Sequence, residues 1–398
     1  MNPDEAFLKN LFPAPCHDRI VMVGGMVRDM LSGRKCKDID LVATLTGEEL
    51  RAFGFRLVEA SSGAEVYFRH HPDFGTIEIT CIDSMDVLKE DLQRRDFTIN
   101  AIAMTLDGTA IDPLKGCDDL AAMRILACSN ETFSHDPLRI FRAFRFECDE
   151  WRMTPETVEL IRQQNWSSCF STMPIERFSH EMIKALSGKT PERFFERMIE
   201  FNVGAEFLPE LFQTPAIPAG PLEHHPEGDL FTHSVQALQR VAASSEDPLA
   251  RFCAFFHDLG KLATDSALYP KHHGHDDAGF EMAERFCTRL CLPVMYRKAL
   301  AWTSRLHGKA NMWEEVRDST KIKMAEQSTK AGIVAILPLV AAADKPGNTP
   351  MSGWDKAVKV AGMNTNELGI DQSRLERMPI ESRASFIMQK RVDCFRSI

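Results

Sequence analysis

Three carboxylates in the first eighty residues have the spacing of a divalent-metal site. Asp38 and Asp40 are two apart in residues 37–42, where polar and apolar residues alternate, and Glu78 has isoleucine on both sides. Side chains two apart on a β-strand project from the same face, so we expect a carboxylate pair to which Glu78, on a second strand, adds a third group. Such a cluster can hold two Mg²⁺ ions, which activate an attacking hydroxyl and neutralise a leaving pyrophosphate. A solvated strand face is the alternative interpretation of the pair.

Two glycines ahead of the carboxylate pair predict a turn that binds phosphate. Residues 20–23 have the apolar character of a short buried strand, and residues 26–31 that of a helix. Gly24 and Gly25 lie between the two, where backbone N–H groups and the helix dipole are available to an anion. Arg28, one turn into the helix, adds a positive charge, so a phosphate cradle is expected beside the carboxylates.

Histidines and aspartates recur in the C-terminal half at the spacing of metal ligands. In chain order they are His233, His257, Asp258, a histidine cluster at 272–275, His307 and Asp344. Imidazoles and carboxylates together suit a divalent transition metal or Mg²⁺. One adjacent histidine and aspartate is more often an ordinary helix-end feature, so the prediction of a metal site depends on the whole series.

The elements that position these groups change along the chain. The first hundred residues have the patterns of short strands and helices, which predicts an α+β head. From about Ser134 the apolar residues fall at helical spacing, and helical segments dominate to the C-terminus. A second boundary is expected at residues 213–221, where three prolines and a glycine in nine residues prevent a continuous helix.

The composition excludes several classes of protein. The chain has 398 residues, 44% hydrophobic and 26% charged, as expected for a folded protein of two to four domains. The longest apolar run, residues 331–343, is shorter than the ~20 residues that cross a bilayer, and the first residues are acidic, unlike a secretory signal. We therefore expect no membrane partner and a cytoplasmic protein. Eleven cysteines without a CxxC pair predict reduced thiols.

The charge balance gives no indication of a nucleic-acid partner. The chain has 57 acidic against 47 basic residues, a net charge of −10. Proteins that bind nucleic acid through a broad surface are usually basic, so an RNA partner has to be inferred from a site.

The head motifs resemble a family of nucleotidyltransferases. Gly24-Gly-Met-Val-Arg-Asp followed by Asp38-Ile-Asp resembles the signature of the DNA polymerase beta superfamily, and Arg94-Arg-Asp-Phe-Thr-Ile-Asn-Ala-Ile-Ala is similar to a segment of class II tRNA CCA-adding enzymes and bacterial poly(A) polymerases. The resemblance implies that Asp38, Asp40 and Glu78 are catalytic with Mg²⁺. It further implies that the nucleotide is bound by Gly24, Gly25, Arg28 and Arg95, and its ribose by Asp96.

A second motif follows at the start of the helical part. His135-Asp-Pro-Leu-Arg resembles the Glu-Asp-x-x-Arg element of the same family, in which an Asp and an Arg select C and A. The resemblance assigns these roles to Asp136 and Arg139. Three-residue spacing places Asp136, Arg139 and Arg142 on one expected helical stripe, so Arg142 is a further candidate for nucleotide binding. A guanidinium and a carboxylate can together bind a base edge, and an ordinary solvated basic stripe is the alternative.

The histidine series resembles the HD phosphohydrolase pattern. The resemblance implies that His233, His257, Asp258 and Asp344 bind a divalent metal in addition to the Mg²⁺ of the head. Together, the changes of pattern along the chain and the resemblances predict four parts: a nucleotidyltransferase head (1–128), a helical neck for base recognition and RNA binding (129–215), an HD domain (216–350) and a helical tail (351–398).

These observations predict a tRNA nucleotidyltransferase that adds CMP, from CTP, to the tRNA 3′ end, with addition of AMP from ATP left open. Members of the family that add the whole CCA end carry a long flexible loop before the Arg-Arg-Asp segment. Here only Ile79 to Gln93 intervene, without glycine or arginine.

A CC-adding enzyme and a poly(A) polymerase are the alternatives within the class. An HD phosphohydrolase with a nucleotide-sensing head and a non-catalytic RNA-binding protein are less favoured, and no oligomeric state is predicted.

Overall fold

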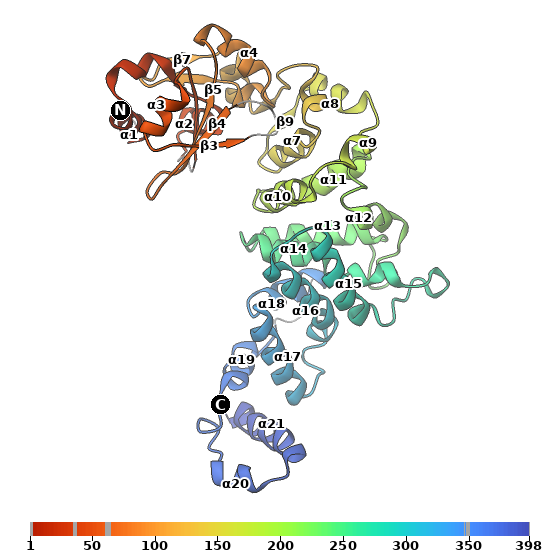
Figure 1. Ribbon diagram of the computed structural model, residues 1–398. Coiled ribbons are helices and arrows are strands. Elements are labelled where there is room, and N and C mark those ends of the chain that lie inside the picture. Colours follow the sequence, from red (N-terminus) through yellow and green to blue (C-terminus); the bar gives the residue numbers. More distant parts are fainter. Residues whose placement is uncertain (1–2, 35–37, 60–64, 346, 348–350, 398) are drawn as a thin grey trace. The chain divides into compact units, whose positions relative to one another are not determined.

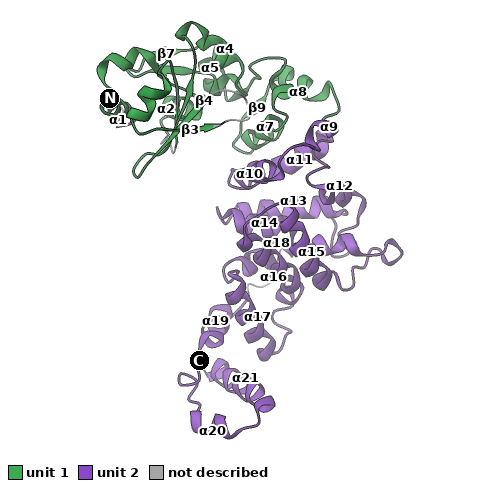
Figure 2. Ribbon diagram, viewed as in Figure 1, with its two compact units in different colours: residues 1–166 green, residues 167–398 purple. Residues whose placement is uncertain are grey.

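The chain forms two compact units, residues 1–166 and 167–398 (Figure 2). The computed structural model describes residues 3–34, 38–59, 65–345, 347 and 351–397. The boundary falls inside the segment expected to be the neck, and the four-part division stays a prediction. Within the described ranges, no helix has both the length and the apolar character needed to span a membrane.

A seven-stranded mixed sheet is the centre of the first unit (Figure 1). Its strand order is β3-β4-β5-β2-β1-β6-β7. The strands are β1 (Ile20–Met22), β2 (Ile39–Ala43), β3 (Arg56–Glu59), β4 (Glu65–His71), β5 (Gly75–Cys81), β6 (Ala103–Thr105) and β7 (Ala110–Ile111). The β2–β5 pair is parallel and the other pairs are antiparallel. Strands β3 and β4 were not among the elements expected from the sequence.

Helices cover the sheet and continue the first unit. They are α1 (Pro3–Leu11), α2 (Gly24–Leu31), α3 (Gly47–Ala52), α4 (Leu88–Gln93), α5 (Gly116–Ala121), α6 (Thr132–His135), α7 (Arg139–Glu147) and α8 (Pro155–Arg162). Short strands β8 (Arg124–Ile125) and β9 (Arg152–Met153) pair in parallel. Helix α2 begins at Gly24, two residues before the expected start.

Side-chain alternation divides the core of the first unit between the two faces of the sheet. Ile39 and Leu41 of β2 pack in one apolar cluster, whereas Val42 packs in a second cluster with Leu88 and Leu92 of α4. Because neighbours along a strand face opposite sides, Asp40 lies on the Val42 side. Strand β2 therefore separates its apolar core residues from its carboxylate.

Within the described residues, the second unit consists of helices and connecting loops, with one isolated β-bridge between Pro218 and Asp229. Its α-helices are α9 (Ser167–Phe170), α10 (Ile175–Leu186), α11 (Glu192–Phe201), α12 (Pro209–Gln213), α13 (Leu230–Ala242), α14 (Pro248–Phe256), α15 (His275–Arg289), α16 (Val294–Asn311), α17 (Asp318–Ala331), α18 (Ile336–Asp344), α19 (Trp354–Gly362), α20 (Gln372–Arg377) and α21 (Ile380–Ser397). The 3₁₀ segment η5 (Leu259–Ala263) follows α14. The predicted fold class, an α+β head followed by helices, is confirmed.

Caps and a buried arginine fix the helices that carry the histidine series. The Asp229 side chain accepts a hydrogen bond from the Thr232 N–H and caps α13, and Pro248 occupies the first turn of α14. Arg251 of α14 is buried and donates to the carbonyls of Leu186 and Gly188, at the end of α10. Helices α13, α14 and α18 pack against one another, and α15 packs on α16 and η5.

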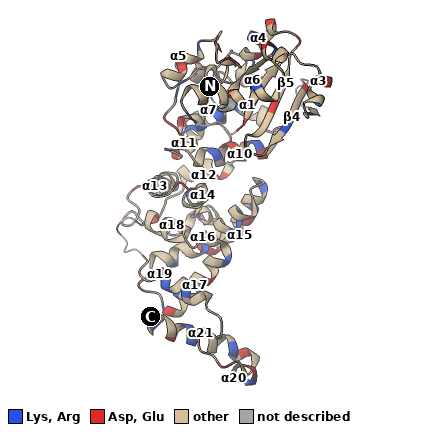
Figure 3. Ribbon diagram, turned by 90° about the vertical axis from the view of Figure 1, so that its left-hand side faces the viewer, with Lys and Arg blue, Asp and Glu red and all other residues tan. Residues whose placement is uncertain are grey.

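Basic and acidic residues are interspersed along the chain (Figure 3).

Candidate functional site

Strand pairing brings two of the three predicted carboxylates together. Asp40 of β2 is the registered partner of Glu78 of β5 in the parallel pair, so both side chains leave the same face of the sheet. Asp38 is exposed and directly precedes β2. The arrangement joins two segments that are almost forty residues apart in the sequence.

The electrostatics of this group favour a bound cation. Burial raises the pKa of Asp40, and the negative charge of Asp38 adds to the rise while Arg95 opposes it. Burial also raises the pKa of Glu78, and the charge of Asp40 adds to that rise. Carboxylates that destabilise one another in this way are stabilised by a divalent ion, and an all-oxygen donor set fits Mg²⁺.

Gly24 allows the carboxylates to approach an arginine. Its φ is +71°, and a Cβ atom at this position would lie 3.0 Å from Asp40 Oδ2 and 3.3 Å from Arg95 Nη1. Both the positive φ and the close contact favour glycine at this position. Arg95 is held in place by Asp91, whose Oδ2 lies 3.2 Å from Nη2 of Arg95. A positive charge therefore lies beside the carboxylates, as triphosphate binding requires.

Arg28 is linked to the Arg-Arg-Asp segment by a residue that the sequence analysis did not select. Arg28 Nη1 donates to Asn100 Oδ1 at 2.7 Å, and Asn100 Nδ2 donates to Asp96 Oδ1 at 3.0 Å. Gly25 lies at the start of the same helix as Arg28, and a Cβ there would be 3.5 Å from Arg28 Nη2. Asn100 follows Asp96 by four residues in the quoted motif, and that position was the only sign of its role.

Asp96 is buried, and its carboxylate accepts hydrogen bonds from Phe97 and Arg142 in addition to Asn100. Its Oδ1 accepts from the Phe97 N–H at 2.7 Å, and its Oδ2 accepts from Arg142 Nη1 at 2.9 Å. Burial opposes ionisation, but the charge of Arg142 and these hydrogen bonds outweigh it and lower the pKa of Asp96. Asp96 is thus held as a carboxylate whose oxygens face the protein, and its predicted ribose contact stays a prediction.

Asp136 and Arg139 flank the start of α7. The expectation that they share one helical stripe is wrong, because Asp136 has extended backbone (φ −151°, ψ 95°) between α6 and α7. Pro137 explains this, since a proline disfavours helical backbone in the residue before it. The guanidinium of Arg139 donates to backbone carbonyls, among them that of Thr132 at 3.1 Å. Burial lowers the pKa of Arg139.

The four histidines and aspartates predicted as metal ligands in the second unit come together. His233 from α13, His257 and Asp258 at the end of α14, and Asp344 at the end of α18 are buried, and one ligand atom from each lies within 4.8 Å of the others. Asp258 Oδ2 lies 3.3 Å from His233 Nε2 and 3.2 Å from His257 Nε2. Asp344 Oδ1 lies 3.1 Å from His233 Nε2. Two imidazoles and two carboxylates form a donor set that fits a divalent cation.

Hydrogen bonds orient the two imidazoles for metal binding. His257 Nδ1 lies 2.8 Å from the Ala254 carbonyl oxygen, which can only accept, so Nδ1 carries a proton and Nε2 is the nitrogen that faces the cluster. His233 Nδ1 is 2.6 Å from Glu227 Oε1. Although burial opposes it, hydrogen bonds from His233 and His225 lower the pKa of Glu227 to about 2, so this carboxylate accepts. The sequence analysis did not select Glu227.

Without a metal ion, the buried carboxylates of this cluster are neutralised by protonated histidines and by a lysine. Burial disfavours the charged imidazoles, but Asp258 and Asp344 outweigh it and raise the pKa of His233 to about 11 and that of His257 to about 9. Lys261 Nζ lies 2.7 Å from Asp258 Oδ2. Protons and a lysine thus neutralise carboxylates that a cation would otherwise neutralise.

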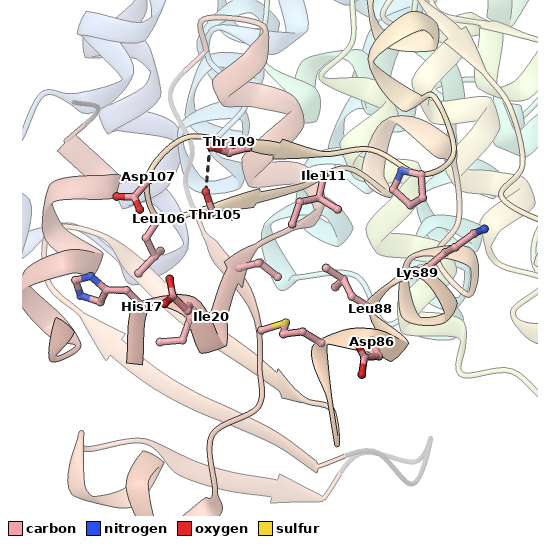
Figure 4. A pocket seen from close by; sticks show the side chains of 14 residues that line it. His17, Ile20, Asp86, Leu88, Lys89, Thr105, Leu106, Asp107, Thr109 and Ile111 are labelled. Carbon is pink, nitrogen blue, oxygen red and sulfur yellow. Dashed lines mark hydrogen bonds between the residues drawn. The ribbon is translucent and has the colours of Figure 1, made fainter. Parts of the chain in front are cut away.

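A separate cavity of about 530 Å³ lies in the first unit (Figure 4). Its lining includes Ile20, Leu88, Lys89 and Ile111 and none of the predicted site residues. Ile20 pairs with Ala43 at the end of β2 away from Asp40. The cavity is therefore not part of the carboxylate group.

Three family models match successive stretches of the chain. Residues 20–85 and 76–126 match the Poly A polymerase head domain, residues 152–214 the Probable RNA and SrmB- binding site of polymerase A, and residues 230–343 the HD domain. The fold is similar to that of a CCA-adding enzyme in its apo form, with a TM-score of 0.66 and 22% identity, covering 98% of this chain and 91% of the other. The CTP complex of a CCA-adding enzyme gives a TM-score of 0.66 at 21% identity, covering 98% of this chain and 92% of the other.

Curated relatives are similar over most of their length. The Multifunctional CCA protein of Nitrosococcus oceani is 34% identical over 320 residues, which are 77% of this chain and 78% of the relative. That of Hahella chejuensis is 31% identical over 359 residues, 84% of this chain and 83% of the relative. The chain therefore belongs to the family of the multifunctional CCA proteins, the CCA-adding nucleotidyltransferases.

Proposed function

We propose that the head transfers nucleotides from CTP, and more slowly from ATP, to the 3′ end of tRNA. The observation that carries this proposal is the registered pair Asp40 and Glu78 with Arg95 beside it, in a chain whose relatives are CCA proteins. The poly(A) polymerase alternative is less favoured, because the curated relatives above carry the CCA name.

Each residue of the site has a role in this transfer. Asp38, Asp40 and Glu78 would hold Mg²⁺, which lowers the pKa of the attacking 3′-hydroxyl and neutralises the leaving pyrophosphate. Arg28, Arg95 and the backbone N–H groups at Gly24 and Gly25 bind the triphosphate.

The remaining groups choose the nucleotide. Asp96 is kept ionised by Arg142, and its role in this proposal is to bind the ribose 2′-hydroxyl. Asp136 and Arg139 bind the edge of the incoming base. These roles correspond to those that the motifs imply.

The connection between β5 and Arg94 supports slow addition of the terminal A. It consists of the short 3₁₀ segment η2 (Met85–Val87) and helix α4. Leu88 and Leu92 of α4 are buried against Val21 and Val42 of the sheet. A segment packed in the core leaves little chain to move, and a switch from C to A recognition needs an element with two positions.

For the second unit we propose a metal-dependent phosphohydrolase site formed by His233, His257, Asp258 and Asp344. Its support is the buried donor set and the HD match.

We further propose the four-part division of head, neck, HD domain and tail. We also propose that the protein works in the cytoplasm, where thiols stay reduced. The described cysteines, which are free thiols, are compatible with this proposal.

The test uses the full chain with two RNA substrates. We expect labelled CTP to be incorporated into tRNA that lacks its CCA end, and no tail to form on an arbitrary RNA with ATP. Long homopolymeric tails on the arbitrary RNA would instead favour a poly(A) polymerase. Absence of incorporation with either substrate, in protein that binds tRNA, would contradict the proposal.

A further inference from the structure

We propose that Arg240 forms a separate phosphate-binding subsite at the mouth of the metal cluster in the helical unit, and that this site therefore prefers esters that carry two phosphate groups. The inference deepens the phosphohydrolase proposed above and rests on it for the reaction, because the subsite selects what the cluster hydrolyses. Its test measures binding as well as turnover, so either proposal can fail without the other.

A cavity of about 800 Å³ leads to the metal cluster. Its lining includes Asp344, a predicted metal ligand, and Glu227, which is hydrogen-bonded to the predicted ligand His233. The other lining residues are Glu223, His224, Pro226, Gln236, Arg240 and Lys345. Cavities of about 300 to 1,000 Å³ typically hold a whole small molecule. This one therefore has room for the rest of a substrate whose scissile phosphate lies at the cluster.

Two hydrogen bonds fix the guanidinium of Arg240 in the wall of this cavity. Arg240 Nη1 donates to the carbonyl oxygen of Ala343, the residue before Asp344, at 2.8 Å. Arg240 Nη2 donates to Gln236 Oε1, one turn earlier on α13, at 2.8 Å. A guanidinium has further N–H donors beyond those used in these bonds. The remaining donors are therefore available, in a fixed orientation, to a group in the cavity.

The positive charge of Arg240 is not neutralised by a carboxylate. Both acceptors of its guanidinium in the described part of the chain are neutral, one a backbone carbonyl and the other a side-chain amide. Among the acidic lining residues, Glu227 accepts hydrogen bonds from His225 and His233, and Glu223 is exposed. Lys345, also exposed, adds a second positive charge to the lining. Arginine binds phosphate through paired, charge-assisted hydrogen bonds, so an anionic phosphate is the group that fits here.

The position of Arg240 separates this subsite from the metal cluster. His233 and Arg240 lie two turns apart on α13, about 10 Å along its axis, and the contact with Gln236 brings the guanidinium back by up to one turn. About 5 to 10 Å along the helix therefore lies between the two subsites. One phosphate group is too small to occupy both, whereas two phosphates joined by a sugar can do so.

The experiment compares adenosine 3′-monophosphate with adenosine 3′,5′-bisphosphate, which differ by one phosphate. The full-length protein carries Asp40→Asn and Arg95→Ala, which weaken nucleotide binding in the head, and is loaded with Mn²⁺. We expect a lower KM for the bisphosphate. Arg240→Gln should raise that KM about ten- to a hundredfold, as loss of a charged hydrogen-bonding group does, with kcat and the KM of the monophosphate nearly unchanged.

A binding measurement covers the case in which neither ester is hydrolysed. Isothermal titration of the same Mn²⁺-loaded protein then gives the Kd of each ester, and the same preference and the same loss are expected. Arg240→Lys should keep part of the preference, because lysine keeps the charge without the paired geometry. Preferential binding of the bisphosphate without hydrolysis would contradict the phosphohydrolase and leave the subsite standing.

Two controls separate a binding role from a structural one. Bound Mn²⁺, measured by mass spectrometry, should be unchanged in Arg240→Gln, which would show that Asp344 is still in place. Arg285→Gln, at an exposed arginine of α15 outside the cavity lining, should behave as the parent. Equal KM or Kd for the two esters in the parent protein would overturn the subsite even where a variant fails to fold, and so would an undiminished preference in Arg240→Gln.

Discussion

Arg139 is hydrogen-bonded to the backbone of Arg94, with 2.8 Å between its Nη2 atom and the Arg94 carbonyl oxygen. Its Nη1 atom also donates to the Arg95 carbonyl, at 3.2 Å. The candidate for base selection therefore contacts the segment that carries the candidate for triphosphate binding. Occupation of one subsite is expected to influence the other through these bonds.

Replacing Arg139 should change nucleotide choice and slow the reaction. We expect Arg139→Ala to let UTP or GTP compete with CTP, because the guanidinium no longer binds the base edge. A lost bidentate contact costs about 1 to 3 kcal/mol. Selectivity, measured as kcat/KM for CTP over UTP, should fall accordingly. Arg152→Ala, at an exposed arginine of β9, is the control, and an unchanged preference in Arg139→Ala would refute the role in base choice.

Removing one carboxylate of the head should abolish transfer while leaving RNA binding intact. Asp40→Asn keeps the size of the side chain and removes its charge, so a metal ligand worth several kcal/mol is lost, a fall of about a thousandfold or more. Incorporation of labelled CTP and binding of tRNA are measured together. Asp83→Asn, at an exposed position after β5, should behave as the parent. Activity of Asp40→Asn within tenfold of the parent would contradict the catalytic assignment.

The packed connection before Arg94 should make addition of the terminal A slow. We expect efficient CTP incorporation into tRNAs that lack the first or second C, and weak ATP incorporation into tRNA that ends in CC. Single-turnover rates on the three substrates measure the difference. A rate for ATP on the CC-ending tRNA close to that for CTP on the shorter tRNAs would restore the assignment of full CCA addition.

The two proposed activities, nucleotide transfer and hydrolysis of phosphate esters, should be separable by mutation. His257→Ala combined with Asp258→Ala should remove metal-dependent hydrolysis of phosphate esters and spare CTP incorporation, because these residues lie in the other compact unit from Asp40. Both activities are measured on one preparation, with Asp40→Asn as the reciprocal control. Equal loss of both activities in either variant would show that the functions are not divided in this way.

Local chemistry was enough to predict several features of this protein. The alternation in residues 37–42 predicted that Asp40 leaves the face opposite Ile39, and side-chain packing in the core agrees. Gly24 was predicted to form a turn, and its positive φ fits that role. Pro137 is a further local signal, because a proline disfavours helical backbone in the residue before it and Asp136 is extended. Such features depend on neighbours in the chain, so the sequence alone determines them.

Other relationships were decided by tertiary structure. Glu78 faces Asp40 only because β2 and β5 pair in parallel and in this register, and pairing between distant segments depends on the whole sheet. In the same way, His275 and His307 reach one oxygen of Asp258 while His233 and His257 reach the other. The sequence shows only that these histidines and aspartates follow one another along the chain. Which oxygen each imidazole meets depends on how four helices pack, because packing fixes the direction in which each side chain points.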